Sequence, residues 1–281
     1  MNTTVTTNET LAEPWEIRKP AEANQPVDWS RTRPRLLSYV GRWGRARRWL
    51  PEDARSVLDV GCAFGYGTVA IVAGTESHRW IVGVERDQRN VEIAAERYPW
   101  LSMVRADARS LPFLDGTIDA VVSLDVLEHL DDPMAVVEEV RRVLRPGGAF
   151  IVSVPQRGIL ARFDSNNVYS WLRSWFRWFL PLEECEESAS GHHKHFNKSE
   201  LMVLLGNGFV VDRWTGSGLG LAELLHVAIA VVFKGLLRWR GAYMVLRHLY
   251  FIAFLLEDLI PSGRFGYTLT VRARAARVAP R

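Results

Sequence analysis

A short apolar segment followed by a glycine-rich turn contains the residues of this sequence that are best suited to chemistry. The run 57–60 includes Asp59 and leads into the turn 61–67 with Gly61, Gly65 and Gly67, and Glu85 follows 24 positions after Gly61. Glycines allow backbone N–H groups to approach a ligand closely, and an acid about 20 residues further on can accept ribose hydroxyls. The pattern predicts a site for an adenosine-containing cofactor.

Two further clusters contain groups that can move a proton or hold a metal. Asp125, Glu128 and His129 lie within five positions, and a later cluster contains His192, His193 and His195. A hydroxyl acceptor needs a base or a metal, and carboxylates with imidazoles suit a hard cation. Three interpretations stay open for Glu128 and His129: a general base, metal ligands, or helix capping and packing. A solvated loop is an equal alternative for the histidine cluster.

The elements that would position these groups alternate between short β-branched runs and helical stretches. Such alternation is typical of βαβ units and predicts an α/β fold with a parallel sheet. We expect strands at 56–60, 80–85, 101–105, 118–124, 149–154, 209–214 and 267–273. The clearest helix is 133–144, with Asp132 as its cap and Pro133 at its first position, and we expect Pro146-Gly147-Gly148 to stop it.

Five motifs, in order, resemble those of class I S-adenosylmethionine-dependent methyltransferases, specifically the type 11-like branch that includes ubiquinone, small-molecule and glycan methyltransferases. They are VLDVGCAFG at 57–65, VGVE at 82–85, RADA at 105–108, DAVVSLDVLEHL at 119–130 and LRPGG at 144–148. The resemblance implies a Rossmann-like, seven-stranded, mostly parallel sheet with helices on both faces. A dehydrogenase is disfavoured, because its glycines follow the spacing G-x-G-x-x-G.

The same resemblance implies S-adenosyl-L-methionine as the cofactor and assigns roles to several residues. Asp59 would organise the loop and face the methionine end, and Glu85 would accept the ribose hydroxyls. Asp107 would accept the adenine amine, and the N–H of Ala108 would donate to a ring nitrogen. The other expected cofactor contacts are Gly61, Cys62, Ala63, Gly65, Arg86 and Leu124. Ala63 replaces the family's usual Gly, so we expect a negative φ there and a slightly less close approach.

Two segments outside these motifs are unusually apolar or aromatic. Residues 221–237 and 243–260 are apolar but interrupted by charges, and neither reaches the roughly 18 apolar residues of a spanning helix. We expect a helical insertion over 219–260 before the last strand, serving as a subdomain, a dimer interface, a membrane-surface contact or a site for an apolar substrate. The aromatic segment 159–190 is expected to form a lid or an interface.

Composition and charge limit the organisation and the setting of the chain. With 281 residues, 48% of them hydrophobic, we expect a disordered tail over 1–30 and one methyltransferase domain over 31–281. Two cysteines exclude a disulfide framework and fit the cytoplasm, with peripheral contact at the inner membrane face as an alternative. Arginines crowd positions 31–48, which fits either a phosphate-binding patch or a solvated helix face.

These observations favour O-methylation of a small-molecule, glycan or lipid-linked acceptor. Amino-group methylation of bases usually goes with an Asn or Asp followed by Pro-Pro-Tyr after the fourth strand, and residues 123–126 differ from it, so nucleic acid is a disfavoured partner. The arginines at 31–48 are the sole support for an RNA or protein methyltransferase. A non-catalytic, cofactor-binding partner subunit is the third interpretation, and a homodimer and a divalent metal also stay open. Among the possible catalytic residues we select His129, Asp125 and His195.

Overall fold

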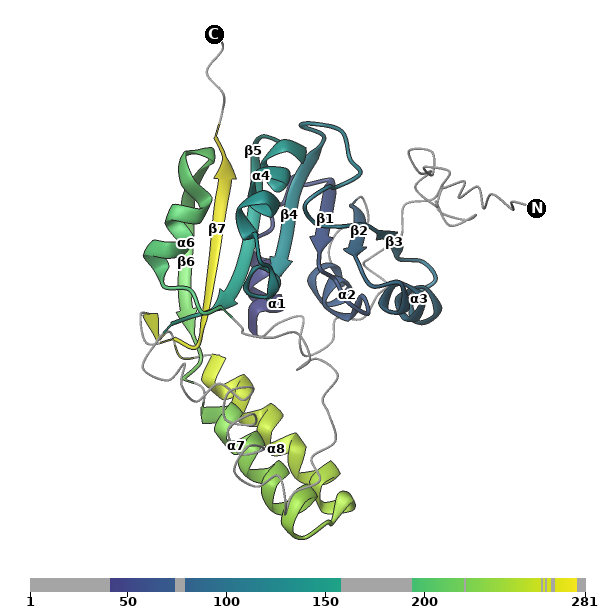
Figure 1. Cartoon of the computed structure of the whole chain (residues 1–281), viewed down its shortest axis with the longest axis vertical. Helices are drawn as coiled ribbons and strands as arrows, with labels where there is room; N and C mark the ends of the chain where they lie inside the picture. Colours follow the sequence, from purple (N-terminus) through teal and green to yellow (C-terminus); the bar gives the residue numbers. More distant parts are fainter. Residues whose placement is uncertain are drawn as a thin grey trace, which may run out of the picture.

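A seven-stranded sheet forms the centre of the computed structural model (Figure 1). The structure describes residues 41–73, 79–157, 194–219, 221–258, 260, 262–263 and 266–276. The strands are β1 (Ser56–Val60), β2 (Trp80–Glu85), β3 (Ser102–Arg105), β4 (Ile118–Leu124), β5 (Leu144–Pro155), β6 (Phe209–Ser217) and β7 (Thr268–Ala275). The tail at 1–30 and the aromatic segment at 159–190 lie outside the described residues.

The strand order, β3-β2-β1-β4-β5-β7-β6, places the glycine-rich turn at the centre of the sheet. Strands β3, β2, β1, β4 and β5 are parallel, whereas β7 runs antiparallel to both of its neighbours. The order reverses between β1 and β4, so the chain leaves these two strands in opposite directions. In open α/β sheets, ligands bind beyond the carboxyl ends of the strands at such a reversal. The predicted fold class is confirmed.

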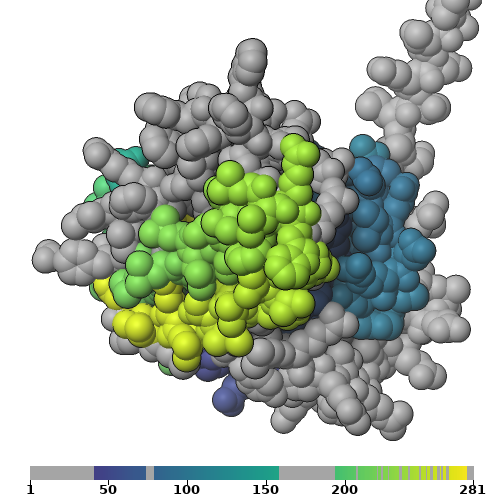
Figure 2. All heavy atoms as spheres, turned by 90° about the horizontal axis from the view of Figure 1, so that it is seen from below, coloured from purple at the N-terminus to yellow at the C-terminus, as the bar shows by residue number. Residues whose placement is uncertain are grey.

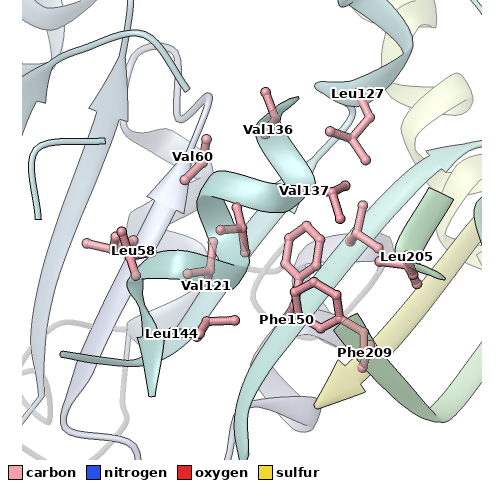
Figure 3. Close-up of a cluster of buried hydrophobic side chains, with 14 of the residues drawn as sticks. Leu58, Val60, Val121, Leu127, Val136, Val137, Leu144, Phe150, Leu205 and Phe209 are labelled. Atoms are coloured by element: carbon pink, nitrogen blue, oxygen red, sulfur yellow. The ribbon is translucent and has the colours of Figure 1, made fainter. Parts of the chain in front are cut away.

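Helices cover both faces of the sheet. They are α1 (Gly41–Trp49), α2 (Tyr66–Val72), α3 (Gln88–Arg97), α4 (Pro133–Val143) and α6 (Lys198–Leu205), with short 3₁₀ turns at η3 (Leu127–His129) and η6 (Gly206–Gly208). One buried cluster joins α4 and α6 to the sheet through side chains such as Val137, Phe150 and Leu205 (Figure 3). A second cluster packs α1 and α2 on the opposite face. Successive residues of β4 point alternately into the first and the second cluster.

Helix α4 begins as the sequence predicted, but it ends one residue earlier and strand β5 begins five residues earlier. Asp132 Oδ1 accepts a hydrogen bond of 3.2 Å from the N–H of Ala135, and Pro133 occupies the first position. The helix ends at Val143, because Leu144 already pairs with Ile118 of β4. An irregularity in this pairing lets Pro146-Gly147-Gly148 lie within β5 rather than form a separate turn.

A pair of helices extends from the edge of the sheet where β1, β4 and β5 end (Figure 1). It consists of α7 (Leu221–Ile229), continued by the π-helical η7 (Ala230–Leu236), and of α8 (Arg240–Asp258). The two helices are fastened at one end by Glu257 of α8, which accepts hydrogen bonds from the N–H groups of Leu219 and Ala222. No helix in the described part of the chain is long and apolar enough to cross a membrane.

Candidate functional site

The turn after β1 is held in a fixed shape by backbone hydrogen bonds and two left-handed glycines. The N–H groups of Gly61 and Cys62 donate to the carbonyl of Val84 at 2.8 and 3.2 Å, and the N–H of Gly65 donates to the Cys62 carbonyl at 2.9 Å. The φ angles of Gly61 and Gly65 are 78° and 72°, a region that glycine adopts without steric cost. A Cβ on Gly61 would overlap Val126, which follows β4.

Asp59 lies beneath this turn and fastens it to helix α2. Its Oδ2 accepts a hydrogen bond of 2.6 Å from the Thr68 hydroxyl, and both residues are buried. Burial raises the pKa of Asp59 to about 6, the Thr68 hydrogen bond opposes the rise, and the charge of Glu85 adds to it. The carboxylate therefore connects strand and helix across the loop, and a role toward the methionine end stays a prediction.

Replacing Asp59 by Asn is expected to remove a pH-dependent cost of folding. Between the ordinary pKa of 3.8 and the folded value of about 6, the folded protein holds a proton that the unfolded chain has lost. Stability should therefore fall as pH rises from about 4 to 6, by about 3 kcal/mol at 1.36 kcal/mol per pH unit. Urea midpoints of the wild type and Asp59→Asn at pH 4 to 8 measure this.

Asp59→Asn should then gain stability relative to the wild type as pH rises, and the gain should level off above pH about 6. The matched control is Asp131→Asn, which removes an exposed carboxylate. Parallel midpoint curves for the wild type and Asp59→Asn would contradict the raised pKa.

Glu85, at the end of β2, fastens two loops together. Its Oε2 accepts a hydrogen bond of 3.0 Å from the N–H of Ala63, and its Oε1 accepts bonds of 2.8 and 2.9 Å from the N–H groups of Arg86 and Asp87. A carboxylate has about four acceptor positions, so about one remains for a ribose hydroxyl without rearrangement. Arg86 thus reaches the site through its backbone.

Ala63 corrects one expectation from the sequence. Its φ is 45°, in the left-handed region, and not negative as the missing glycine suggested. The hydrogen bond from its N–H to Glu85 and the turn closed by Cys62 and Gly65 hold this conformation against the steric cost of the Cβ. The turn therefore has the shape that a glycine would give it.

Cys62 and Gly67 pack the turn against its surroundings. The Cys62 Sγ lies 4.0 Å from Met103 Sδ, and a Cβ on Gly83 would meet both sulfurs at 2.7 Å. Burial raises the pKa of the Cys62 thiol well above its usual value, so the thiol stays protonated. A Cβ on Gly67 would meet the indole of Trp43 at 2.7 Å, so this glycine allows α1 to lie against α2.

Asp107 follows β3 and is already engaged by a neighbour that the sequence analysis did not consider. Its Oδ1 accepts bonds from the backbone N–H and Nε of Arg109 at 2.9 and 3.0 Å, and its Oδ2 accepts from Nη2 at 2.7 Å. These hydrogen bonds, chiefly from the Arg109 side chain, lower the pKa of Asp107 to about 2. Ala108 packs against the core beside it. The adenine roles of both residues stay predictions.

Asp125, directly after Leu124 of β4, forms an ion pair with α1. Its carboxylate lies 2.6 Å from the guanidinium of Arg42, and its φ of 57° is unusual for a residue other than glycine. Burial raises the pKa of Asp125, although the charges of Arg42 and His129 oppose the rise. Asp125 is therefore fixed beside the turn at Gly61, which Val126 contacts.

Two arginines of the basic segment face the sheet rather than solvent. Arg42 pairs with Asp125, and Arg45 is buried, with its Nε 3.4 Å from the Thr270 hydroxyl of β7. Neither of the two alternatives for 31–48, a phosphate-binding patch or a solvated helix face, describes these two positions. Their spacing of three residues, which places both on one side of a helix, was the signal available in the sequence.

His129 and His195 belong to two segments that meet beside η3. His129 is exposed, while Glu128 beside it is buried. The N–H of Lys194 donates to the Glu128 carbonyl at 3.2 Å, and the backbone of Phe196 bonds to Pro155 and Arg157, so His195 lies between η3 and the end of β5. Within the described ranges, no three His, Cys, Asp or Glu side chains could hold a metal ion. His192 and His193 lie outside those ranges.

Residues 58–152 match the family model described as a methyltransferase domain. This match covers about a third of the chain, from β1 to β5, and the similarity to methyltransferases is that of this part. A probable S-adenosylmethionine-dependent methyltransferase of Mycolicibacterium smegmatis is 40% identical over 173 residues, which are 60% of this chain and 58% of that protein. A relative from Mycobacterium tuberculosis is 40% identical over 106 residues, 37% of each chain. The chain therefore spans about 58% and 37% of the lengths of these relatives.

Solved structures share the fold at low identity. A complex of a methyltransferase with a methyltransferase activator from Haloferax volcanii gives a TM-score of 0.54 at 22% identity, covering 85% of this chain and 90% of the matched one. A SAM-dependent methyltransferase of Thermotoga maritima gives 0.53 at 19% identity, covering 85% and 91%. At these identities the likeness extends to the fold alone.

Proposed function

We propose that this chain is an S-adenosylmethionine-dependent methyltransferase. The observation that carries the proposal is the hydrogen bond of 3.0 Å between Glu85 and the N–H of Ala63, which joins the predicted ribose acceptor to the glycine turn. Asp59 supports the same turn from below through Thr68. Turn, acid and the reversal of strand order meet at one edge of the sheet, where a nucleoside would bind.

The residues present fit the cofactor. Gly61 and Gly65 let the turn pack closely on Val126 and Leu101, where a Cβ would overlap, and Glu85 is held at the turn by three backbone N–H groups. When bound, the cofactor supplies a methyl carbon made electrophilic by its sulfonium. The chain's own task is then to align the acceptor and to remove its proton.

We propose an oxygen acceptor on a small molecule, a glycan or a lipid-linked compound. Burial lowers the pKa of Arg42, but Asp125, Glu128, Tyr267 and Tyr250 together raise it above its usual value. Tyr250 belongs to α8, so the apolar helix pair lies within electrostatic range of Arg42. A polar edge beside an apolar helix suits an acceptor with a hydroxyl on a hydrophobic body.

His129 is the group that we assign to proton removal, with Asp125 and His195 as its neighbours. His129 is exposed, and its charge lowers the pKa of Asp125, so the two side chains are close enough to interact. Because Arg42 already pairs with Asp125, we assign Asp125 to holding the site in shape and to stabilising a charged imidazole. General bases of this kind contribute about 10²- to 10⁴-fold to turnover.

Turnover in cell extract tests the function. Incubation with methyl-labelled S-adenosylmethionine and fractionated cell extract should yield S-adenosylhomocysteine and one labelled fraction. His129→Ala should then reduce turnover by about 100-fold or more, with the affinity for the cofactor unchanged. The matched control is His248→Ala, an exposed histidine on α8. Full activity of His129→Ala would contradict its role as the base and leave His129 with a packing role.

Two alternative functions differ from the main proposal in the same assay. An RNA or protein methyltransferase would label a macromolecular fraction, although the inward Arg42 and Arg45 leave it less support. A non-catalytic partner subunit would bind the cofactor without turnover in any fraction. The fold likeness to a methyltransferase solved together with its activator is the reason to keep this third case.

A further inference from the structure

The helix pair α7–α8 presents apolar side chains to the outside at helical spacing. On α8 the exposed positions include Met244, Val245, Leu249, Ile252 and Leu256. On α7 and η7 they include Leu221, Leu225, Val232 and Leu236. From Val245 to Leu256 the exposed positions recur every three or four residues, and those of α7 and η7 recur every four or seven, which places each series on one face of a helix. Surface helices normally direct an apolar stripe toward the core and a polar stripe toward water. In α7 and α8 the apolar stripe instead lies on the exposed side.

The polar side chains of the helix pair make contacts between the two helices. The ring of His226 stacks on Tyr250 with centroids 4.6 Å apart, and its Nε2 lies 3.3 Å from the Tyr243 hydroxyl. Glu257 is buried and caps the start of α7. The two helices therefore hold each other through their inner faces, and their outer apolar stripes remain for another surface.

Between its acidic ends, at Glu223 and at Glu257 and Asp258, the helix pair has charges of one sign. From 224 to 256 the sequence contains no Asp or Glu, but it contains Lys234, Arg238, Arg240 and Arg247. The connection 236–239, which includes the last residue of η7, carries Leu236, Leu237 and Trp239 at 66, 58 and 63% exposure, beside exposed Arg238. Trp and Leu beside Arg is the composition of helices that lie in the headgroup region of a bilayer.

We propose that the outer face of α7–α8, with the connection 236–239 as its leading edge, docks on the surface of an anionic lipid bilayer. Apolar stripes would enter the acyl boundary, and the exposed Arg238 would meet lipid phosphates. A second copy of this chain fits less well, because a symmetric contact would bring like charges together with no acid between 224 and 256 to pair them. Figure 2, seen from below, shows α7 and α8 together on the face that would meet the bilayer.

Vesicle co-sedimentation of the full chain tests the proposal without cofactor or turnover, so its result is independent of the proposed enzymatic function. The chain should sediment with vesicles of phosphatidylglycerol and phosphatidylcholine, bind pure phosphatidylcholine at least about tenfold more weakly, and be released by salt. The double variant Leu237→Glu/Trp239→Ser should lose binding by about tenfold or more. The matched control is Leu114→Glu/Val203→Ser, which makes the same kinds of change at exposed positions outside the helix pair.

Light scattering and thermal unfolding of the same proteins complete the test. Unchanged unfolding of all variants, with vesicle binding lost only at the connection, supports the docking surface. Recovery of the wild type in the supernatant with anionic vesicles would overturn it. A wild-type dimer that Leu237→Glu/Trp239→Ser converts to monomer, in protein that does not bind vesicles, would instead assign the face to a second copy.

Discussion

Glu85→Gln is expected to weaken binding of S-adenosylmethionine by at least about tenfold, because charge-assisted hydrogen bonds to the ribose contribute roughly 1.5 to 3 kcal/mol each. Gln keeps one acceptor oxygen, which can serve the N–H groups of Arg86 and Asp87, whereas the N–H of Ala63 loses its acceptor. Glu85→Ala would leave all three without their acceptor and would disturb both loops as well. Titration calorimetry with S-adenosylmethionine and S-adenosylhomocysteine measures the loss.

Glu92→Gln is the matched control, because Glu92 is an exposed acid on the neighbouring α3 whose carboxylate accepts only from Gln88 among the bonds of the described chain. Its affinity for the cofactor should equal that of the wild type. If Glu85→Gln binds the cofactor with unchanged affinity and unfolds at the same temperature as the wild type, the assignment of Glu85 to the ribose is wrong.

Gly61→Ala should lower the free energy of unfolding by about 2 to 5 kcal/mol. The φ of 78° costs about 1 to 2 kcal/mol for any other residue, and overlap with Val126 adds roughly 1 to 3 kcal/mol. The displaced turn should also lose cofactor affinity, because it would no longer hold Glu85 in place through the N–H of Ala63. Chemical denaturation with and without S-adenosylmethionine separates the two effects.

Two further variants separate backbone strain from overlap. Gly116 has a φ of 64°, and a Cβ there would meet nothing within 4 Å, so Gly116→Ala should show the strain alone. The double variant Gly61→Ala/Val126→Ala should regain part of the lost stability. Ala63→Gly should leave the free energy of unfolding unchanged or raise it by up to about 1 kcal/mol, since it removes a Cβ from a left-handed position. Equal losses for Gly61→Ala and Gly116→Ala would exclude the overlap.

The central strands and the turn were predictable because their signals are local. Strands β1, β2 and β4 have the bounds that their β-branched runs predicted, and Asp132 caps α4 as its position before Pro133 suggested. The motif at 57–65 and the acid at Glu85 meet in space, because neighbouring parallel strands bring their carboxyl ends to one edge. Much of the candidate cofactor site was therefore accessible from residue types and spacing.

Contacts between distant segments were decided only by the tertiary structure. The pairing of Arg42 with Asp125 depends on where α1 lies against the sheet, and nothing in either segment alone indicates it. The left-handed φ of Ala63 follows from the bond to Glu85, which outweighs the local preference of alanine. The sequence of α7–α8 likewise predicts two apolar helices, but which stripe turns inward is fixed by the contacts of His226 and Glu257. Periodicity is a property of a single segment, so the sequence by itself determined it. Packing and ion pairs join two distant segments, so only the tertiary structure decided them.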